Sequence, residues 1–242
     1  MKTLLEELAQ KLNITLSEKQ LDQFLLYQNE LKEWNEKINL TAITEDREII
    51  VKHFIDSLTI LKYVGDGDKM IDVGTGAGFP GIPVKIAKPD TDVTLLDSLN
   101  KRLLFLQNII EKNSLEKITC VHGRAEDVSR ETIHREAYDI ATARAVANMA
   151  TLAELCLSFV KVGGKFICMK GSNIDEVEEG KRAIEVLGGK IETIEKLSLP
   201  VIDAARDGDS NIERNIIIIR KIKNTPKEYP RKAGTPAKNP IK

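Results

Sequence analysis

Residues 70–81, with the sequence MIDVGTGAGFPG, constrain the fold more than any other part of this chain. An apolar segment runs directly into alternating glycines at Gly74, Gly76 and Gly78. Glycine has no Cβ atom, so such a turn can adopt positive φ angles and lie directly against a ligand. About 19 residues after the last of these glycines, a second apolar segment ends at Asp97, where folds of this kind hold the hydroxyls of a ribose. Together the two segments predict a nucleotide-binding site.

Two classes of nucleotide cofactor fit this glycine spacing. From Gly76 onward the run also matches the GxGxxG pattern of dinucleotide-binding enzymes. A dinucleotide needs the free N–H groups of a helix N-terminus for its pyrophosphate, and Pro80 and Pro83 remove donors there. Asp72 suits the ammonium group of S-adenosylmethionine and disfavours a pyrophosphate. The residues therefore favour S-adenosylmethionine, and the alternative without a ligand is a tight connection between a strand and a helix.

The composition is that of an ordinary globular protein, with 42% hydrophobic and 30% charged residues among 242. No apolar run approaches the ~20 residues of a membrane span, and the N-terminus lacks the apolar core of a signal peptide. We therefore expect a cytoplasmic protein without membrane association. Cys120, Cys156 and Cys168 form no Cys-x-x-Cys pair, so we expect reduced core thiols and no metal site. Nothing in the sequence indicates an obligate dimer, so we expect a monomer.

The N-terminal part of the chain predicts only helices. Residues 17–37 carry apolar side chains at helical spacing behind a capping box that begins at Ser17. A shorter helix is expected near residues 3–12, and a third from about residue 45 to residue 63 behind Thr44 as its cap. From residue 69 onward, strands and helices alternate, which specifies a parallel sheet covered on both faces. Predicted strands are residues 69–73, 92–97, 117–121, 138–143, 164–170, 190–197 and 214–222, and the helices between them centre near residues 84, 106, 131, 152 and 180.

The predicted fold is an α/β, Rossmann-like, seven-stranded and mostly parallel sheet with an N-terminal helical extension. No helix separates the last two strands, so they should form an antiparallel hairpin at one edge. This arrangement resembles that of S-adenosylmethionine-dependent methyltransferases, which supports the cofactor favoured above. We expect an N-terminal helical subdomain over residues 1–64, a methyltransferase domain over 65–223 and a C-terminal tail over 224–242.

The C-terminal tail is basic and rich in proline. It holds four of the eight prolines of the chain and has no helical or strand period, so it should lie extended over the surface or become ordered on a partner. Residues 221–242 include seven lysines or arginines and one acid, Glu228. A local contact with a polyanion is therefore expected, with a merely solvated tail as the alternative. We expect this segment to serve RNA rather than the cofactor.

Candidate ligand-binding residues lie where the predicted parallel strands end, because ligands of such sheets bind outside the carboxyl ends of the strands. Ala125 and Glu126 follow the third strand and should lie beside an adenine, whose amine needs an acceptor; a surface role is the alternative for Glu126. Phe79, just after the glycines, could close over the cofactor. Residues 53–57 place His53, Asp56 and Ser57 on one helical face, but a helix flank lacks the strained elbow and oxyanion hole of a hydrolase.

Several motifs together resemble one family over essentially the whole chain. They are residues 72–83 (DVGTGAGFPGIP), 96–102 (LDSLNKR), 124–126 (RAE), 142–146 (TARAV) and 229–236 (YPRKAGTP), with residues 34–35, 39–41 and 53–57 in support. They are similar to the ribosomal RNA small-subunit methyltransferase G family, also called glucose-inhibited division protein B. Residues 173–211 match no motif of that family that we can name.

The resemblance implies a methyltransferase that uses S-adenosylmethionine to methylate N7 of one guanosine in the decoding-region loop of 16S rRNA. Its substrate would be 16S rRNA or the small ribosomal subunit. Arg144 would be the catalytic residue and also a cofactor contact, since its guanidinium can hold a phosphate or the guanine O6 atom. A small-molecule methyltransferase and a non-catalytic ribosome-binding protein remain the alternatives. The full set of expected cofactor-binding residues is Asp72, Gly74, Gly76, Gly78, Phe79, Asp97, Ser98, Leu99, Ala125, Glu126 and Arg144.

Overall fold

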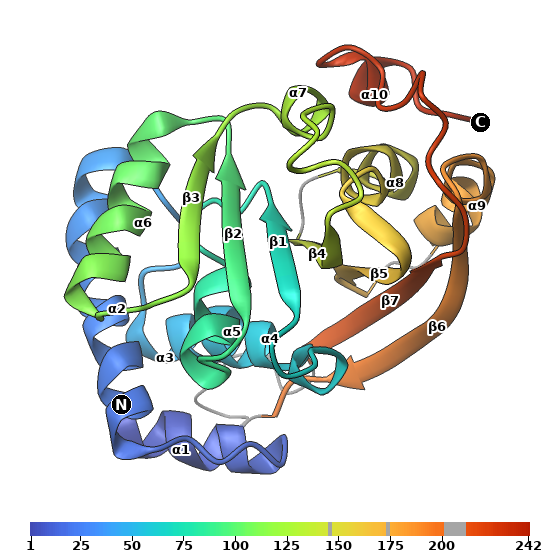
Figure 1. Ribbon diagram of the computed structural model, residues 1–242. Coiled ribbons are helices and arrows are strands. Elements are labelled where there is room, and N and C mark those ends of the chain that lie inside the picture. Colours follow the sequence, from blue (N-terminus) through green and yellow to red (C-terminus); the bar gives the residue numbers. More distant parts are fainter. Residues whose placement is uncertain (145–146, 173–174, 201–211) are drawn as a thin grey trace.

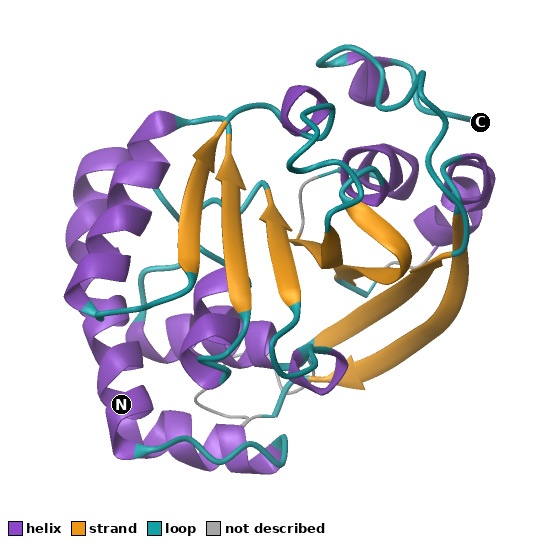
Figure 2. Cartoon of the chain, viewed as in Figure 1, coloured by secondary structure: helices purple, strands orange, loops and turns teal. Residues whose placement is uncertain are grey.

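The computed structural model describes residues 1–144, 147–172, 175–200 and 212–242, and it shows helices packed around one twisted sheet (Figures 1 and 2). The strands are β1 (Lys69–Val73), β2 (Asp92–Asp97), β3 (Ile118–His122), β4 (Tyr138–Arg144), β5 (Val160–Lys170), β6 (Gly189–Ser198) and β7 (Glu213–Lys221). Their order is β3-β2-β1-β4-β5-β7-β6. Strands β1 to β5 pair in parallel, and β7 pairs antiparallel with both β5 and β6. The predicted seven-stranded, mostly parallel sheet with an antiparallel edge is therefore confirmed.

The N-terminal helices pack beside the sheet. They are α1 (Lys2–Lys11), α2 (Glu18–Ile38), α3 (Asp46–Ile49), a π-helical turn (Ile50–Ile55), α4 (Asp56–Leu58) and a 3-10 turn (Leu61–Tyr63). Helix α2 begins at the predicted capping box, where the Gln20 N–H donates to Ser17 Oγ at 3.3 Å and the Ser17 N–H donates to Gln20 Oε1 at 2.8 Å. The N-terminal helical extension is thus present as expected.

The remaining helices follow the strands. They are α5 (Gly81–Ala87), α6 (Asn100–Lys112), α7 (Ala125–Val128), α8 (Met149–Leu157), α9 (Asp175–Val186) and α10 (Thr235–Lys238). Residues that alternate along each strand face opposite sides of the sheet. In β7, Ile216 and Ile218 join the core formed with the N-terminal helices, whereas Ile217 and Ile219 join the core formed with α8 and α9. Burial on both faces explains the continuous apolar run in this strand.

Two predicted helices differ from the structure. The helix expected from residue 45 to residue 63 is divided by the π-helical turn, and its cap is the Glu45 side chain, which accepts the Glu48 N–H at 2.9 Å, rather than Thr44. The helix expected near residue 131 is only the single turn α7, followed by turns over residues 129–136. There, Arg130 and Arg135 donate to backbone carbonyls of the C-terminal segment, so these residues bridge two parts of the chain instead of forming a helix face.

The C-terminal segment, residues 224–242, packs against the protein surface near α8 (Figure 1). Two of the seven cations counted in the sequence have internal partners. Lys221 is fully buried and donates to the Leu157 carbonyl at 2.5 Å, and Arg231 pairs with Glu154 at 2.7 Å. These two side chains are therefore unavailable for RNA phosphates, which corrects the expectation from the sequence. The exposed cations of this region are Lys223, Lys227, Lys232, Lys238 and Lys242.

Gly81→Ala should destabilise the protein by about 1–3 kcal/mol, the usual cost of overpacking a filled site. A Cβ atom at Gly81 would lie 2.9 Å from Asp72 Oδ2 and would also collide with the Leu95 side chain. Gly171→Ala is the matched control, because its Cβ atom would meet nothing within 4 Å. Urea unfolding of both variants tests this. Equal stability of the two variants would show that the α5 N-terminus tolerates the extra atom.

Candidate active site

The glycine turn connects β1 to α5. Gly74, Gly76 and Gly78 all have positive φ angles, of 70°, 60° and 98°. The N–H groups of Gly74 and Thr75 donate to the Leu96 carbonyl of β2, at 2.9 and 3.0 Å. The turn is therefore fixed to the neighbouring strand, and the positive φ angles explain why these positions need glycine.

The buried carboxylate of Asp72 lies beneath this turn. Its Oδ2 atom accepts the Thr75 hydroxyl at 2.6 Å and the Gly81 N–H at 2.9 Å, which ties both ends of the turn together. Burial raises the pKa of Asp72 to about 6, although the two hydrogen bonds favour its charged form. Among the described residues, its Oδ1 atom has no hydrogen-bond partner. The side chain is buried and is not among the residues that line the pocket described below, and its predicted contact with the cofactor stays a prediction.

Asp97, at the end of β2, is the carboxylate that reaches the pocket. Its Oδ2 atom accepts the Gly76 N–H at 3.0 Å and an Arg102 N–H at 3.3 Å, and its Oδ1 atom accepts the Leu99 N–H at 2.9 Å. Asp97 is only 3% exposed. It therefore joins the glycine turn to the start of α6 while it lines the pocket.

The pocket has a volume of about 240 Å³ and lies at the carboxyl ends of β1, β2 and β3. Of the residues predicted from the sequence, Gly74, Asp97, Ser98, Ala125 and Glu126 meet in it. Gly76, Gly78 and Leu99 support the same turn and strand end without lining the pocket. The complete lining is Val73, Gly74, Leu96, Asp97, Ser98, Gly123, Arg124, Ala125, Glu126, Ala147, Thr151, Leu152, Leu155, Gly234 and Ala237.

The C-terminal segment contributes Gly234 and Ala237 to this lining, which the sequence did not predict. The Gly234 N–H donates to Glu126 Oε1 at 2.8 Å, so one oxygen of the predicted adenine acceptor already has a partner. The segment that the sequence assigned to RNA therefore borders the same pocket as Gly74 of the glycine turn, and its role towards RNA or the cofactor stays a prediction. The motif at residues 229–236 was the only signal for it, and no local spacing links that motif to the pocket.

Phe79 does not close over the pocket. Its ring stacks on His53, with a centroid distance of 4.4 Å, and on Tyr27 at 5.4 Å, and it is only 5% exposed. The Cζ atom of the Arg144 guanidinium lies 4.9 Å from the centroid of the same ring. The aromatic side chains supplied by α2 and the π-helical turn hold Phe79 in the core and outside the pocket lining, and its contact with the cofactor stays a prediction.

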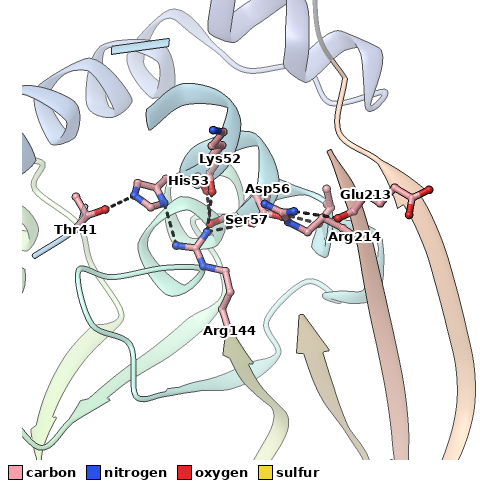
Figure 3. A network of polar contacts seen from close by, with 9 residues as sticks. Thr41, Lys52, His53, Asp56, Ser57, Arg144, Glu213 and Arg214 are labelled. Carbon is pink, nitrogen blue, oxygen red and sulfur yellow. Dashed lines mark hydrogen bonds and ion pairs between the residues drawn. The ribbon is translucent and has the colours of Figure 1, made fainter. Parts of the chain in front are cut away.

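Arg144, at the end of β4, lies in a network of polar contacts beside a second pocket (Figure 3). Its Nη1 atom donates to Asp56 Oδ2 and to the Lys52 carbonyl, each at 3.2 Å. Arg214 donates from Nε to Asp56 Oδ1 at 3.0 Å, so one carboxylate holds two guanidiniums. Burial raises the pKa of Asp56, and the charges of both arginines oppose that shift. The structure therefore separates Arg144 from the pocket that contains Asp97.

The second pocket has a volume of about 340 Å³ and lies at the ends of β4 and β5 and the start of β7. Its lining includes four cationic side chains and one buried carboxylate, a charge balance suited to an anionic group. Arg214 was missed in the sequence because it stands beside a run of isoleucines that reads only as a strand. The lining is Lys52, His53, Asp56, Arg144, Met169, Lys170, Gly171 and Arg214.

His53 is neutral in this network. Burial and the charge of Arg144 lower its pKa to about 3. An arginine can only donate, so His53 Nδ1 accepts from Arg144 Nη2 at 3.2 Å, and Nε2 carries the proton that it donates to Thr41 Oγ1 at 2.9 Å. The Ser57 hydroxyl donates to the His53 backbone carbonyl at 2.6 Å rather than to its ring. This geometry agrees with the rejection of a hydrolase triad.

Within residues 1–144, 147–172, 175–200 and 212–242, no helix is long and apolar enough to cross a membrane. In the same described residues, no cluster of three or more His, Cys, Asp or Glu side chains could hold a metal ion. Ala145 and Val146, which belong to one of the family motifs, lie outside the described residues.

The sheet order and the glycine turn define the Rossmann-like fold that solved methyltransferases share. TYW2 of M. jannaschii, solved in complex with AdoMet, is 14% identical and covers 70% of this chain and 76% of its own, with a TM-score of 0.53. The precorrin-6y C5,15-methyltransferase of Geobacter metallireducens is 16% identical and covers 76% of this chain and 92% of its own, with a TM-score of 0.51.

Sequence comparisons identify the family. A family model described as rRNA small subunit methyltransferase G matches residues 20–204. A relative of that name from Acetivibrio thermocellus is 52% identical over 100% of this chain and 97% of its own. Another from Alkaliphilus metalliredigens is 50% identical over 100% of this chain and 99% of its own. The chain belongs to the rRNA small subunit methyltransferase G family, which confirms the resemblance seen in the sequence.

His53→Gln should make the stability of the protein less dependent on pH between about pH 6 and pH 4. The unfolded chain binds a proton on His53 near pH 6.5, whereas the folded protein binds it only near pH 3. The free energy of unfolding therefore falls as the pH drops below 6.5, by up to about 1.4 kcal/mol per pH unit from this group. Glutamine can keep both hydrogen bonds but does not titrate.

Urea unfolding across this pH range measures the effect. Gln10→Ala, at an exposed position and without a titratable group, is the control and should keep the pH dependence of the original protein. If His53→Gln and the original protein lose stability in parallel, the buried imidazole is protonated in both states and the neutral assignment is wrong.

Proposed function

We propose that this protein transfers the methyl group of S-adenosylmethionine to N7 of one guanosine in the decoding-region loop of 16S rRNA. The observation that carries this proposal is the pair of pockets at the carboxyl edge of one sheet. One contains a glycine turn and Asp97, and the other contains Arg144 and Arg214. The pockets occur in a chain whose full-length relatives are named for methylating small-subunit rRNA.

The first pocket fits the nucleoside end of S-adenosylmethionine. Its volume of about 240 Å³ is below the roughly 300–1,000 Å³ typical of whole drug-sized ligands, so the methionyl end should lie outside it, along the glycine turn. A Cβ atom at Gly76 would meet no protein atom closer than 4.0 Å, which shows open space over the turn. The negative charge of Asp72 lies under this space and attracts an ammonium group without direct contact.

Asp97 holds the ribose in this proposal, because it is the carboxylate that lines the pocket at the end of β2. Glu126 Oε2 and the backbone of Ala125 face the base. When bound, S-adenosylmethionine supplies an electrophilic methyl group on a sulfonium. The residues of the chain then have to orient the methyl group and the target guanine, and to exclude other nucleophiles such as water.

The reaction needs no general base. Guanine N7 is an exposed acceptor with a lone pair and no proton to lose. The contribution of the protein is therefore the alignment of N7 with the methyl group, which is the proximity effect. Arg144 is the residue that we assign to the target nucleotide, since its planar guanidinium can hold guanine O6 or a phosphate. Asp56 and His53 fix the direction of that guanidinium.

RNA binding would involve the exposed lysines of the C-terminal region, because non-specific affinity for RNA comes mainly from phosphate contacts. The substrate would be 16S rRNA, free or within the small ribosomal subunit, and the protein would act as a cytoplasmic monomer. We divide the chain as before into a helical subdomain over residues 1–64, a methyltransferase domain over 65–223 and a C-terminal segment over 224–242.

The deciding experiment uses tritium-labelled S-adenosylmethionine with 16S rRNA, with small ribosomal subunits and with a cell extract freed of RNA. We expect label in rRNA, and mass spectrometry of the digested RNA should place it in 7-methylguanosine. Label in a small molecule would favour a small-molecule methyltransferase. No transfer at all, despite cofactor binding, would favour a non-catalytic ribosome-binding protein.

Asp97→Ala should weaken binding of S-adenosylmethionine by ~1.5–3 kcal/mol, the range for lost hydrogen bonds to a charged group. The substitution removes the acceptor for the ribose and also releases the Gly76 N–H. Asp92→Ala, at the exposed start of the same strand, is the control and should bind normally. Titration calorimetry gives both affinities. An affinity for Asp97→Ala equal to that of the control would remove Asp97 from the cofactor site.

Arg144→Lys should lower kcat/KM for rRNA methylation by about tenfold to a hundredfold, because lysine cannot reproduce the planar fork. Cofactor affinity should change little, since Arg144 does not line the first pocket. Arg220→Lys serves as the control, because Arg220 is paired with Glu192 and lines neither pocket. Normal turnover by Arg144→Lys would leave Arg144 as a structural partner of Asp56.

A further inference from the structure

The C-terminal segment is anchored by a buried ion pair. Glu154, on α8, is 0% exposed. Its Oε1 atom accepts the backbone N–H of Arg231 at 2.7 Å and Arg231 Nε at 3.0 Å, and its Oε2 atom accepts Arg231 Nη2 at 2.7 Å. Both carboxylate oxygens therefore face the same arginine. A carboxylate buried to this extent is stable as an ion only with such a partner.

Further hydrogen bonds hold the chain on both sides of Arg231. Before it, Arg135 donates to the carbonyls of Thr225 at 2.9 Å and of Tyr229 at 3.0 Å. After it, the Thr151 hydroxyl donates to the Pro236 carbonyl at 3.0 Å. Thr151 itself lines the first pocket. The path of the C-terminal segment is thus set by contacts with side chains of α8 and of the turns over residues 129–136, and not by its own short helix α10.

This path carries Gly234 and Ala237 to the pocket that also contains Asp97. Glu126 connects the two sides, because it lines the pocket and accepts the Gly234 N–H at 2.8 Å. Pro236, between the two pocket residues, is buried, whereas Ala237 is exposed towards the pocket opening. The wall of the pocket is therefore incomplete without residues from the end of the chain.

We propose that residues 229–238 form one wall of the cofactor pocket and contribute to cofactor binding. Glu154 and Arg231 are positioning residues that hold this wall in place. The inference rests on the proposed function, since it takes the pocket to be the S-adenosylmethionine site. A wall that is ordered before the ligand arrives spares the ligand the entropy of ordering it. Loss of the ion pair therefore reduces cofactor affinity, and it leaves the chemical step intact once the cofactor is bound.

The first test compares Arg231→Met with Arg220→Met. Both substitutions remove an arginine from an ion pair. Arg220 pairs with Glu192, and neither residue lines the pocket. We expect Arg231→Met to bind S-adenosylhomocysteine at least about fivefold more weakly, as for loss of one or two hydrogen bonds. Arg220→Met should match the original protein. Equal affinities of the two variants, in folded protein, would overturn the inference.

A second variant covers the case in which Arg231→Met does not fold. Ala237→Glu places a carboxylate at an exposed position of the wall, in the pocket that Glu126 also lines, so it should fold normally and still weaken binding several-fold. Val162→Glu adds the same charge at an exposed position outside the pocket lining, and it should bind normally. An unchanged affinity of Ala237→Glu, with an unchanged unfolding temperature, would contradict a wall at this position.

Kinetics separate a positioning role from a general loss of structure. For Arg231→Met we expect a higher KM for S-adenosylmethionine with kcat and the KM for RNA unchanged, whereas partial unfolding would lower kcat. A rise only in the KM for RNA would assign the segment to RNA binding and overturn the inference. If the original protein binds no S-adenosylmethionine or S-adenosylhomocysteine, the proposed function itself fails. If it binds them and the variants bind equally well, only the present inference fails.

Discussion

The buried carboxylate of Asp72 is the interaction on which the candidate site depends. It accepts hydrogen bonds from Thr75 and from Gly81, the residues that open the glycine turn and begin α5. Fixing both ends of the turn aims the Gly76 N–H at Asp97 on the neighbouring strand. The burial that raises the pKa of Asp72 is the cost of this arrangement, and the two hydrogen bonds offset part of it. The carboxyl ends of β1 and β2 are therefore joined at the candidate site.

The second pocket depends on the N-terminal helices. The π-helical turn carries His53 and leads into Asp56, and together they fix Arg144 at the end of β4 (Figure 3). π-helical turns are uncommon and occur frequently at functional sites. The same turn packs Phe54 into the aromatic core beside Phe79. The π-helical turn thus packs against Phe79 of the glycine turn and also positions Arg144, the residue that we assign to the target nucleotide.

Local patterns in the sequence were sufficient for the strands, the capping box at Ser17 and the placement of Asp97 at a strand end. Those features follow from periodicity and from glycine geometry, which act over a few residues. The sequence could not predict the position of Phe79 or the wall formed by Gly234, because each results from contacts between segments far apart in the chain. The break at the π-helical turn was missed for a related reason: its residues keep a helical apolar pattern throughout.

Amide hydrogen exchange with and without S-adenosylhomocysteine tests the location of the cofactor site most directly. The account predicts added protection at the glycine turn from Gly74 to Gly78, around Asp97, at Ala125 and Glu126, and in the C-terminal segment near Gly234. Protection confined to the opposite edge of the sheet would contradict it. A cavity of about 430 Å³ lies there, lined in part by Gln20, Lys85 and Lys117, and provides the alternative location for a ligand.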